Sequence, residues 1–221
     1  MIDDWRYQDN RQYEYSIHST QQRAEYEPIV DWIAEGAKVV DFGCGDGSLL
    51  DLLTDRKSIV PLGYDVSSSG VSACQAKAID AVCDRIDKKH SELADSSFDY
   101  AICNVTLQMV DYPELLIQEM IRVAPNQIIS FPNFAYYKNR IDMAMYGRMP
   151  QPMLFGYQWF STGHTHQLSI HDFHTLLKSY PSTAIKKSHH IGTKHFFLNP
   201  FLNTYPNLLS KISIFLLSRT A

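Results

Sequence analysis

The segment from Val39 to Gly47 (VVDFGCGDG) carries the strongest chemical signal in the sequence. Two β-branched residues lead to Asp41, and three alternating glycines follow before the apolar pair Leu49 and Leu50. This order predicts a buried strand, a tight turn and the first turn of a helix. A doubly wound sheet binds nucleotide-like ligands at such a unit of strand, loop and helix. Glycine permits positive φ angles and a close approach of the backbone to that ligand.

The spacing of the glycines narrows the choice of ligand. A dinucleotide fingerprint would have glycines at 43, 45 and 48, whereas position 48 is Ser48 and the third glycine is Gly47. We therefore expect a ligand without a pyrophosphate group. A glycine-rich turn in some other α/β protein is the alternative.

Polar residues also follow two later apolar segments. Asp65 ends the segment 58–65 and lies about 20 residues beyond the glycine loop, where a carboxylate commonly binds ribose hydroxyls. Its alternative role is to cap the following helix. Asn104 and Gln108 follow the segment 97–104, and they should lie at the mouth of a pocket because ligands bind beyond the carboxyl ends of parallel strands. Asn104 is equally suited to capping the next turn.

Histidines are concentrated in one stretch of the chain. His166 lies in the polar loop 161–167 and is a candidate base or substrate ligand, because histidine titrates near neutral pH. The alternative is a histidine bonded to the loop backbone. His164, His171 and His174 are close by, but His171 and His174 should start a helix and no cysteine accompanies them, so we expect no metal site.

The remaining pattern alternates strands and helices, which predicts an α/β fold with a parallel sheet and helices on both faces. The chain is expected to form a single domain over 1–221, with an N-terminal extension at 1–22 and an aromatic-rich insertion or lid at about 132–167. Strands are expected at 38–42, 59–64, 79–83, 98–103, 127–131, 184–190 and 211–217, and helices at 23–34, 47–54, 68–77, 113–123 and 171–178.

Composition excludes several classes of protein. The net charge of −4 argues against general nucleic-acid binding, although Lys138, Arg140 and Arg148 form a local basic group. The four cysteines contain no C-x-x-C pair and are expected to be buried thiols. The N-terminus lacks the regions of a signal peptide, and the apolar run 212–217 is too short to span a bilayer. We therefore expect a soluble cytoplasmic protein without a membrane partner.

The loop resembles the acid-x-Gly-x-Gly-x-Gly loop of class I S-adenosylmethionine-dependent methyltransferases. The resemblance implies a Rossmann-like, mostly parallel seven-stranded sheet with an antiparallel edge pair. It also implies that Asp41 helps to hold the cofactor ammonium and that Asp84, with Asp87 as the second choice, meets the adenine amino group; either could be a solvated loop acid. The implied cofactor-binding residues are Asp41, Gly43, Cys44, Gly45, Gly47, Asp65, Val66, Asp84, Arg85 and Asn104.

Longer strings are similar to the MetW family of methyltransferase-like proteins, which is linked to bacterial methionine biosynthesis. They cover most of the chain from Trp32 to Arg219 and include FPNF, GRMP and an aromatic segment ending at His166. The strings are VVDFGCGDGSLLDLL, GYDVSSSGVSAC, SFDYAICNVTLQ, EMIRVAPNQIISFPNF, YGRMP, YQWFSTGHTHQLSIHDF and PNLLSKISIFLLSR.

Two functions follow from these resemblances. The first is methyl transfer from S-adenosylmethionine to a small molecule, which leaves S-adenosylhomocysteine. The second is that of a MetW-like partner or activator of a homoserine O-acyltransferase, and an exposed apolar surface near 143–155 would favour it. Methylation of a protein or RNA finds no basic groove in the sequence.

Methyl transfer mainly requires alignment of the acceptor and exclusion of water, and a base only where the acceptor must lose a proton. The candidate catalytic residues are His166, Gln108 and Asn104. Aromatic faces favour a sulfonium, and the candidates for walls of the site are Tyr13, Tyr15, Tyr157 and Trp159. The methionines of the insertion are expected to fill gaps in the core or to form a flexible lid; they are Met143, Met145, Met149 and Met153.

Overall fold

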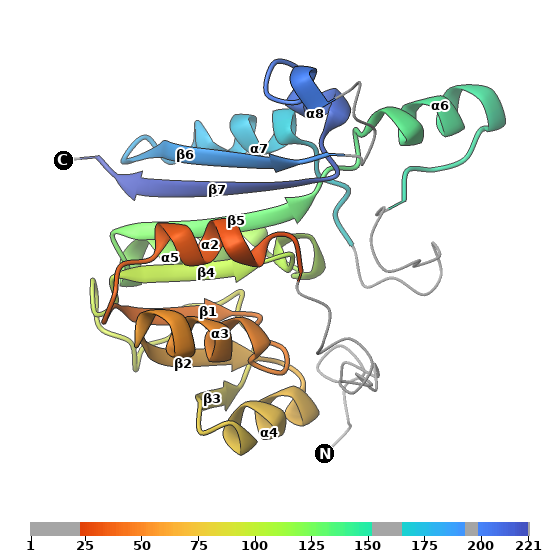
Figure 1. Cartoon of the computed structure of the whole chain (residues 1–221). Coiled ribbons are helices and arrows are strands. Elements are labelled where there is room, and N and C mark those ends of the chain that lie inside the picture. Colours follow the sequence, from red (N-terminus) through yellow and green to blue (C-terminus); the bar gives the residue numbers. More distant parts are fainter. Residues whose placement is uncertain (1–22, 152–164, 193–198, 221) are drawn as a thin grey trace.

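The computed structural model describes residues 23–151, 165–192 and 199–220. These residues form a seven-stranded sheet in the order β3-β2-β1-β4-β5-β7-β6, in which β1 to β5 are parallel and the β7 and β6 edge pair is antiparallel (Figure 1). The strands are β1 (Lys38–Phe42), β2 (Val60–Asp65), β3 (Asp80–Cys83), β4 (Tyr100–Asn104), β5 (Asn126–Pro132), β6 (Thr183–Ile191) and β7 (Ile212–Arg219). The Rossmann-like fold with an antiparallel edge is confirmed.

Helices cover both faces of the sheet (Figure 1). Val39 and Val40 of β1 are both fully buried but belong to separate apolar clusters, because successive strand residues point to opposite faces. The helices are α2 (Tyr26–Trp32), α3 (Ser48–Lys57), α4 (Ser68–Ala76), α5 (Pro113–Val123), α6 (Tyr137–Tyr146), α7 (Ile170–Leu177) and α8 (Pro206–Leu209), with 3₁₀ turns η1 (Leu107–Met109) and η2 (Asn199–Phe201). The α2 and α3 helices pack on the Val39 side, and α5 and α7 pack on the Val40 side.

The helix ends follow the local sequence. Pro113 occupies the first turn of α5, where its missing N–H costs nothing. Ser169 caps α7 in a capping box with Asp172. None of the helices that the structure describes is both long and apolar enough to cross a membrane.

The structure differs from the expectations at Cys83, in the insertion and at the methionines of the insertion, where it contradicts the core alternative. Cys83 is exposed because β3 is a short edge strand, whereas Cys44, Cys74 and Cys103 are buried. The insertion contains a helix, α6, that the sequence did not predict. Its methionines do not fill the core: Met143, Met145 and Met149 are each more than half exposed, at 51%, 71% and 60%, and Met153 lies outside the described residues.

Candidate functional site: the glycine loop

The loop from Gly43 to Gly47 joins the end of β1 to the start of α3. The backbone N–H groups of Gly43 and Cys44 both donate to the Tyr64 carbonyl, at 2.7 and 3.1 Å, which ties the loop to β2. Gly43, Gly45 and Gly47 have φ angles of +94°, +55° and +74°, in the left-handed region that favours glycine. The sequence therefore uses glycine where the backbone requires it.

The loop is packed on one side and open on another. A Cβ atom on Gly43 would lie 2.6 Å from Cγ2 and Oγ1 of Thr106, in the turn that follows β4. A Cβ atom on Gly45 would have no atom of the described residues within 4 Å. A ligand can thus approach the Gly45 backbone, while Gly43 is required for packing.

Asp65 links the end of β2 to this loop. One carboxylate oxygen accepts the N–H of Gly45 at 2.8 Å, and the other accepts the N–H of Ser67 at 2.8 Å. Asp65 does not cap α4, because the N-cap is Ser67, whose hydroxyl accepts the N–H of Gly70. The carboxylate is 8% exposed and lies beside the open part of the loop.

Asp41 is the last residue but one of β1, and it is 1% exposed. Its Oδ1 atom has no hydrogen-bond partner among the residues that the structure describes. Its pKa is raised to about 7, chiefly by burial and also by the charge of Asp65, while the charge of Arg23 acts to lower it. A buried acceptor without a donor is costly, so this oxygen suits a ligand that brings a proton donor or a positive charge.

Arg23 is a site residue that the sequence reasoning missed. Its guanidinium donates to Glu25 Oε1 at 2.6 Å and lies over the ring of Tyr26, 5.3 Å from the ring centroid. Its charge also acts on Asp41. Figure 1 shows why: α2 begins at the carboxyl edge of the parallel strands and runs back to the start of β1. The signal in the sequence was only an arginine just ahead of the first helix.

The acids after β3 have different surroundings. The Asp84 N–H donates to the Asp65 carbonyl at 3.0 Å, and the Asp84 carboxylate forms an ion pair with Lys88 at 2.5 Å. Asp87 is buried and holds Arg85 through two nitrogens, at 2.9 and 2.7 Å. It also accepts the N–H groups of residues 111 and 112, at 3.0 and 3.1 Å. Asp84 is thus close to the glycine loop, whereas the hydrogen bonds of Asp87 fix the chain ahead of α5.

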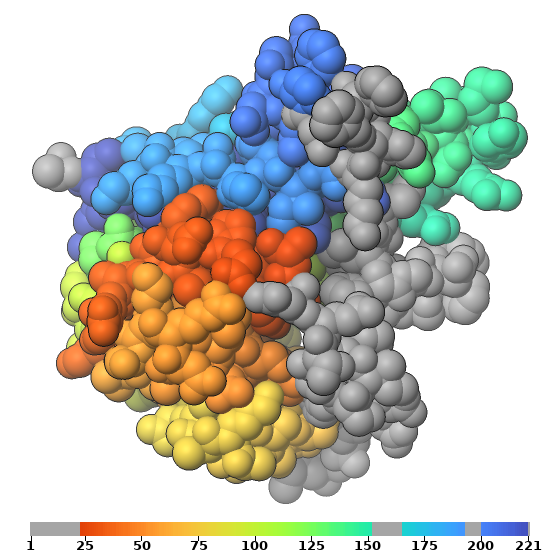
Figure 2. Space-filling model, viewed as in Figure 1, coloured from red at the N-terminus to blue at the C-terminus, as the bar shows by residue number. Residues whose placement is uncertain are grey.

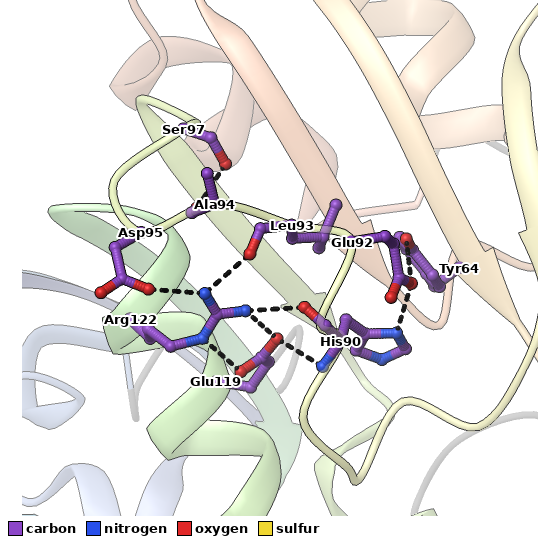
Figure 3. A network of polar contacts seen from close by, with 9 residues as sticks. All are labelled: Tyr64, His90, Glu92, Leu93, Ala94, Asp95, Ser97, Glu119 and Arg122. Atoms are coloured by element: carbon purple, nitrogen blue, oxygen red, sulfur yellow. Dashed lines mark hydrogen bonds and ion pairs between the residues drawn. The ribbon is translucent and has the colours of Figure 1, made fainter.

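The connection between β3 and β4 is held by Arg122 of α5 (Figure 3). Its guanidinium donates to the carbonyls of His90 and Leu93, at 2.9 and 2.7 Å, and pairs with Glu119 and Asp95, each at 2.6 Å. Glu119 in turn accepts the His90 N–H at 2.8 Å. This clamp fixes the irregular segment that carries the acids after β3.

The polar groups beyond β4 are hydrogen-bonded within the protein. The Ser130 hydroxyl donates to Asn104 Oδ1 at 2.5 Å, so this oxygen binds a strand neighbour instead of capping the turn. Gln108 Nε2 donates to the Pro132 carbonyl at 2.9 Å, whereas its buried Oε1 has no partner among the described residues. Val105 between them has a φ of +56°, a strained angle for a β-branched residue.

The structure brings His166 to the same turn. The Gln108 carbonyl accepts the backbone N–H of His166 at 3.1 Å and that of Thr165 at 2.9 Å. The side chain of His166 is exposed. Among the described residues no three His, Cys, Asp or Glu side chains gather as metal ligands. His164 and the wall candidates Tyr13, Tyr15, Tyr157 and Trp159 lie outside the described residues.

Comparisons with known proteins agree with this geometry. A family model described as methionine biosynthesis protein MetW matches residues 23–217. A bifunctional methionine biosynthesis protein MetXA/MetW of Rhodopirellula baltica is 35% identical over 160 residues, which are 68% of this chain. The matched segment spans only 26% of that relative.

Solved structures share the fold at low sequence identity. A Mesorhizobium loti S-adenosylmethionine-dependent methyltransferase has a TM-score of 0.66 at 19% identity, over 89% of this chain and 98% of the other. Geranyl diphosphate C-methyltransferase of Streptomyces coelicolor A3(2), solved with S-adenosylhomocysteine, has a TM-score of 0.63 at 13% identity, over 89% and 79% of the two chains. A putative methyltransferase in complex with the Trm112 activator of Haloferax volcanii has a TM-score of 0.63 at 16% identity, over 88% of each chain.

Proposed function

Since the chain belongs to the MetW family, we propose that it binds S-adenosylmethionine at the glycine loop and transfers the methyl group to a small molecule. The observation that carries this proposal is the buried Oδ1 of Asp41, which has no donor among the described residues and lies beside a loop whose Gly45 those residues leave open. The cofactor has an ammonium group for this oxygen and no phosphate that would require a pyrophosphate cradle.

The proposed contacts follow from the positions of the side chains. Asp41 holds the ammonium, and the backbone at Gly45 lies against the methionine part of the cofactor. Asp65 keeps acceptor capacity for ribose hydroxyls, because a carboxylate can accept more than the two N–H bonds seen here. The further proposed contacts are Gly43, Cys44 and Gly47 in the loop, Val66, Asp84 and Arg85 after β2 and β3, and Asn104 after β4.

Arg23 completes the charge pattern of this site. The amino-acid part of the cofactor carries a carboxylate as well as an ammonium, and the guanidinium of Arg23 lies close enough to Asp41 to lower its pKa. Arginine binds carboxylates through a planar fork of donors. We assign the cofactor carboxylate to Arg23.

When bound, the cofactor supplies an activated methyl group on a sulfonium, and the protein has to align the acceptor and exclude water. His166, Gln108 and Asn104 line the edge from which an acceptor would approach. The amides can orient the acceptor, and the imidazole of His166 is the general-base candidate of the three.

Calorimetric titration with S-adenosylhomocysteine tests the cofactor site. Asp65→Ala should bind more weakly than the wild type, while Asp55→Ala, a surface carboxylate on α3, should bind equally. Equal binding by wild type and Asp65→Ala would remove Asp65 from the site, and no binding by the wild type would overturn the proposal. Labelled methyl donor incubated with a small-molecule extract should then yield a labelled product.

A second candidate function is that of partner or activator of a homoserine O-acyltransferase. It is favoured by the relative in Rhodopirellula baltica, whose name joins MetXA and MetW in one chain. An exposed apolar surface near 143–155 would favour this function, and the exposed apolar side chains at 143–149 therefore support it. This function predicts a stable complex with the acyltransferase and no labelled small molecule in the extract assay.

A further inference from the structure

The α6 helix is barely covered by the rest of the protein. Asn139 is its one buried residue, and it anchors the helix by donating to the carbonyls of Phe134 and Gln151, at 3.0 and 2.9 Å. Figures 1 and 2 show the remainder of the helix standing out beyond the carboxyl edge of the sheet. Large apolar side chains cover its exposed part and define the α6 surface: Ile141, Met143, Met145, Tyr146 and the following Met149.

A helix of this kind needs a partner. Ten residues are too few for a stable isolated helix in water, and helices in proteins gain most of their stability by burying an apolar face. The helix is nevertheless well formed and ends at Gly147 in a left-handed cap, with the Gly147 N–H donating to the Met143 carbonyl at 3.1 Å. The chain therefore presents an ordered apolar surface that its own described residues leave uncovered.

The composition of the α6 surface is that of a protein interface. Methionine, tyrosine and arginine are enriched at the centres of such interfaces, and exposed methionines adapt to a partner's shape. Arg148 lies over the ring of Tyr146, 5.8 Å from the centroid, which holds this aromatic side chain in place. Met143 also borders a cleft of about 250 Å³ between α6 and the start of α7, which has room for an inserted side chain.

The charges around the surface select the partner. Residues 137–149 hold three basic side chains, Lys138, Arg140 and Arg148, against one acid, Asp142, in a chain whose net charge is −4. Apolar side chains dominate this surface, and the Arg140 guanidinium is engaged by the carbonyls of Ala135 and Asn207. These features fit a protein with an apolar patch and an acidic rim better than a nucleic acid.

We propose that the α6 surface is the docking site of the homoserine O-acyltransferase. This inference rests on the second candidate function above and adds to it the place of contact. It separates the two activities in space, because the glycine loop binds the cofactor while α6 binds the partner.

The test is a titration of the purified acyltransferase from the same genome with wild-type protein and two variants. Met145→Glu places a charge at the centre of the α6 surface and should weaken binding by about 30-fold or more. Leu115→Glu is the matched control, because Leu115 is an exposed leucine in the first turn of α5, where an acid is tolerated. It should bind like the wild type, and both variants should bind S-adenosylhomocysteine normally.

Each other outcome overturns the inference. If the wild type binds the acyltransferase and Met145→Glu binds equally well, the partner function stands and its place on α6 is wrong. If the wild type does not bind, the partner function falls together with the docking site. If Met145→Glu changes the mass of the protein alone in light scattering, without changing acyltransferase binding, the occupant of α6 is a second copy of this chain.

Discussion

Replacing Gly45 by alanine tests two roles of this glycine, one in the stability of the folded loop and one in ligand binding. Gly45 has a φ of +55°, and an added Cβ atom would meet nothing within 4 Å in the part of the chain that the structure describes. The Gly45 N–H would still donate to Asp65, because the substitution leaves the backbone groups unchanged. The added methyl group would therefore occupy only the space into which the cofactor is proposed to fit.

Gly36 supplies a matched control for the backbone effect. It has a φ of +69° in the turn between α2 and β1, and a Cβ atom there would also meet nothing within 4 Å. An L-residue in the left-handed region costs about 1–2 kcal/mol, so Gly36→Ala and Gly45→Ala should lose similar free energies of unfolding. For a chain of this size the loss corresponds to a melting temperature lowered by about 2–8 °C.

The two variants should differ in cofactor binding alone. Calorimetry with S-adenosylhomocysteine should show at least about tenfold weaker binding for Gly45→Ala, or 1.4 kcal/mol, and unchanged binding for Gly36→Ala. Thermal unfolding without ligand should give the two variants similar melting temperatures. If Gly45→Ala bound as tightly as Gly36→Ala, the glycine loop would not be the cofactor cradle.

Three further predictions concern buried charges. The pKa of Asp41 is raised to about 7, chiefly by burial, so the folded protein keeps a proton that the unfolded chain releases near pH 4. The stability of the wild type relative to Asp41→Asn should therefore fall from about pH 4 to 7 in denaturant titrations. The comparison is made with this variant because the lowered pKa of His190 makes stability rise over the same range. Arg23→Gln should weaken binding of S-adenosylmethionine more than that of its decarboxylated analogue in calorimetry, and an equal loss would contradict the carboxylate assignment. Arg122→Ala leaves the buried Glu119 carboxylate without its cation and should cost about 3–5 kcal/mol in chemical unfolding, far more than Asp95→Ala on the solvent side of the same clamp.

The sheet and most of its helices could be predicted because local sequence and burial agree there. Buried parallel strands are apolar on both faces, so segments such as 38–42 and 127–131 stand out as short β-branched runs. Proline and serine also mark the starts of α5 and α7. The predicted strand ends lie within two residues of the observed ones, because the glycine loop and the acids that end strands can be recognised in the sequence.

The features that the sequence did not predict depend on contacts between residues that are far apart in the chain. The α6 helix does not show the usual pattern of a buried apolar face and a polar solvent face, because its exposed side chains, such as Met143 and Met145, are themselves apolar. Arg23 is distant from Asp41 in sequence and approaches it because α2 starts at the carboxyl edge of the sheet. Asp87 looks like a ligand acid until its bonds to Arg85 and to the backbone ahead of α5 are seen.

The acceptor side of the site differs in kind from the cofactor side. Asp41 and Gly45 leave an acceptor oxygen and open space for a ligand, whereas Asn104 and Gln108 already form hydrogen bonds with β5. Amides do not take up protons at neutral pH, so among the candidates proton removal would depend on His166 alone. A small-molecule acceptor that already carries a free electron pair, such as an amine or a thiolate, needs no such step. The proposed methyl transfer is therefore best matched to an acceptor that is nucleophilic before it binds.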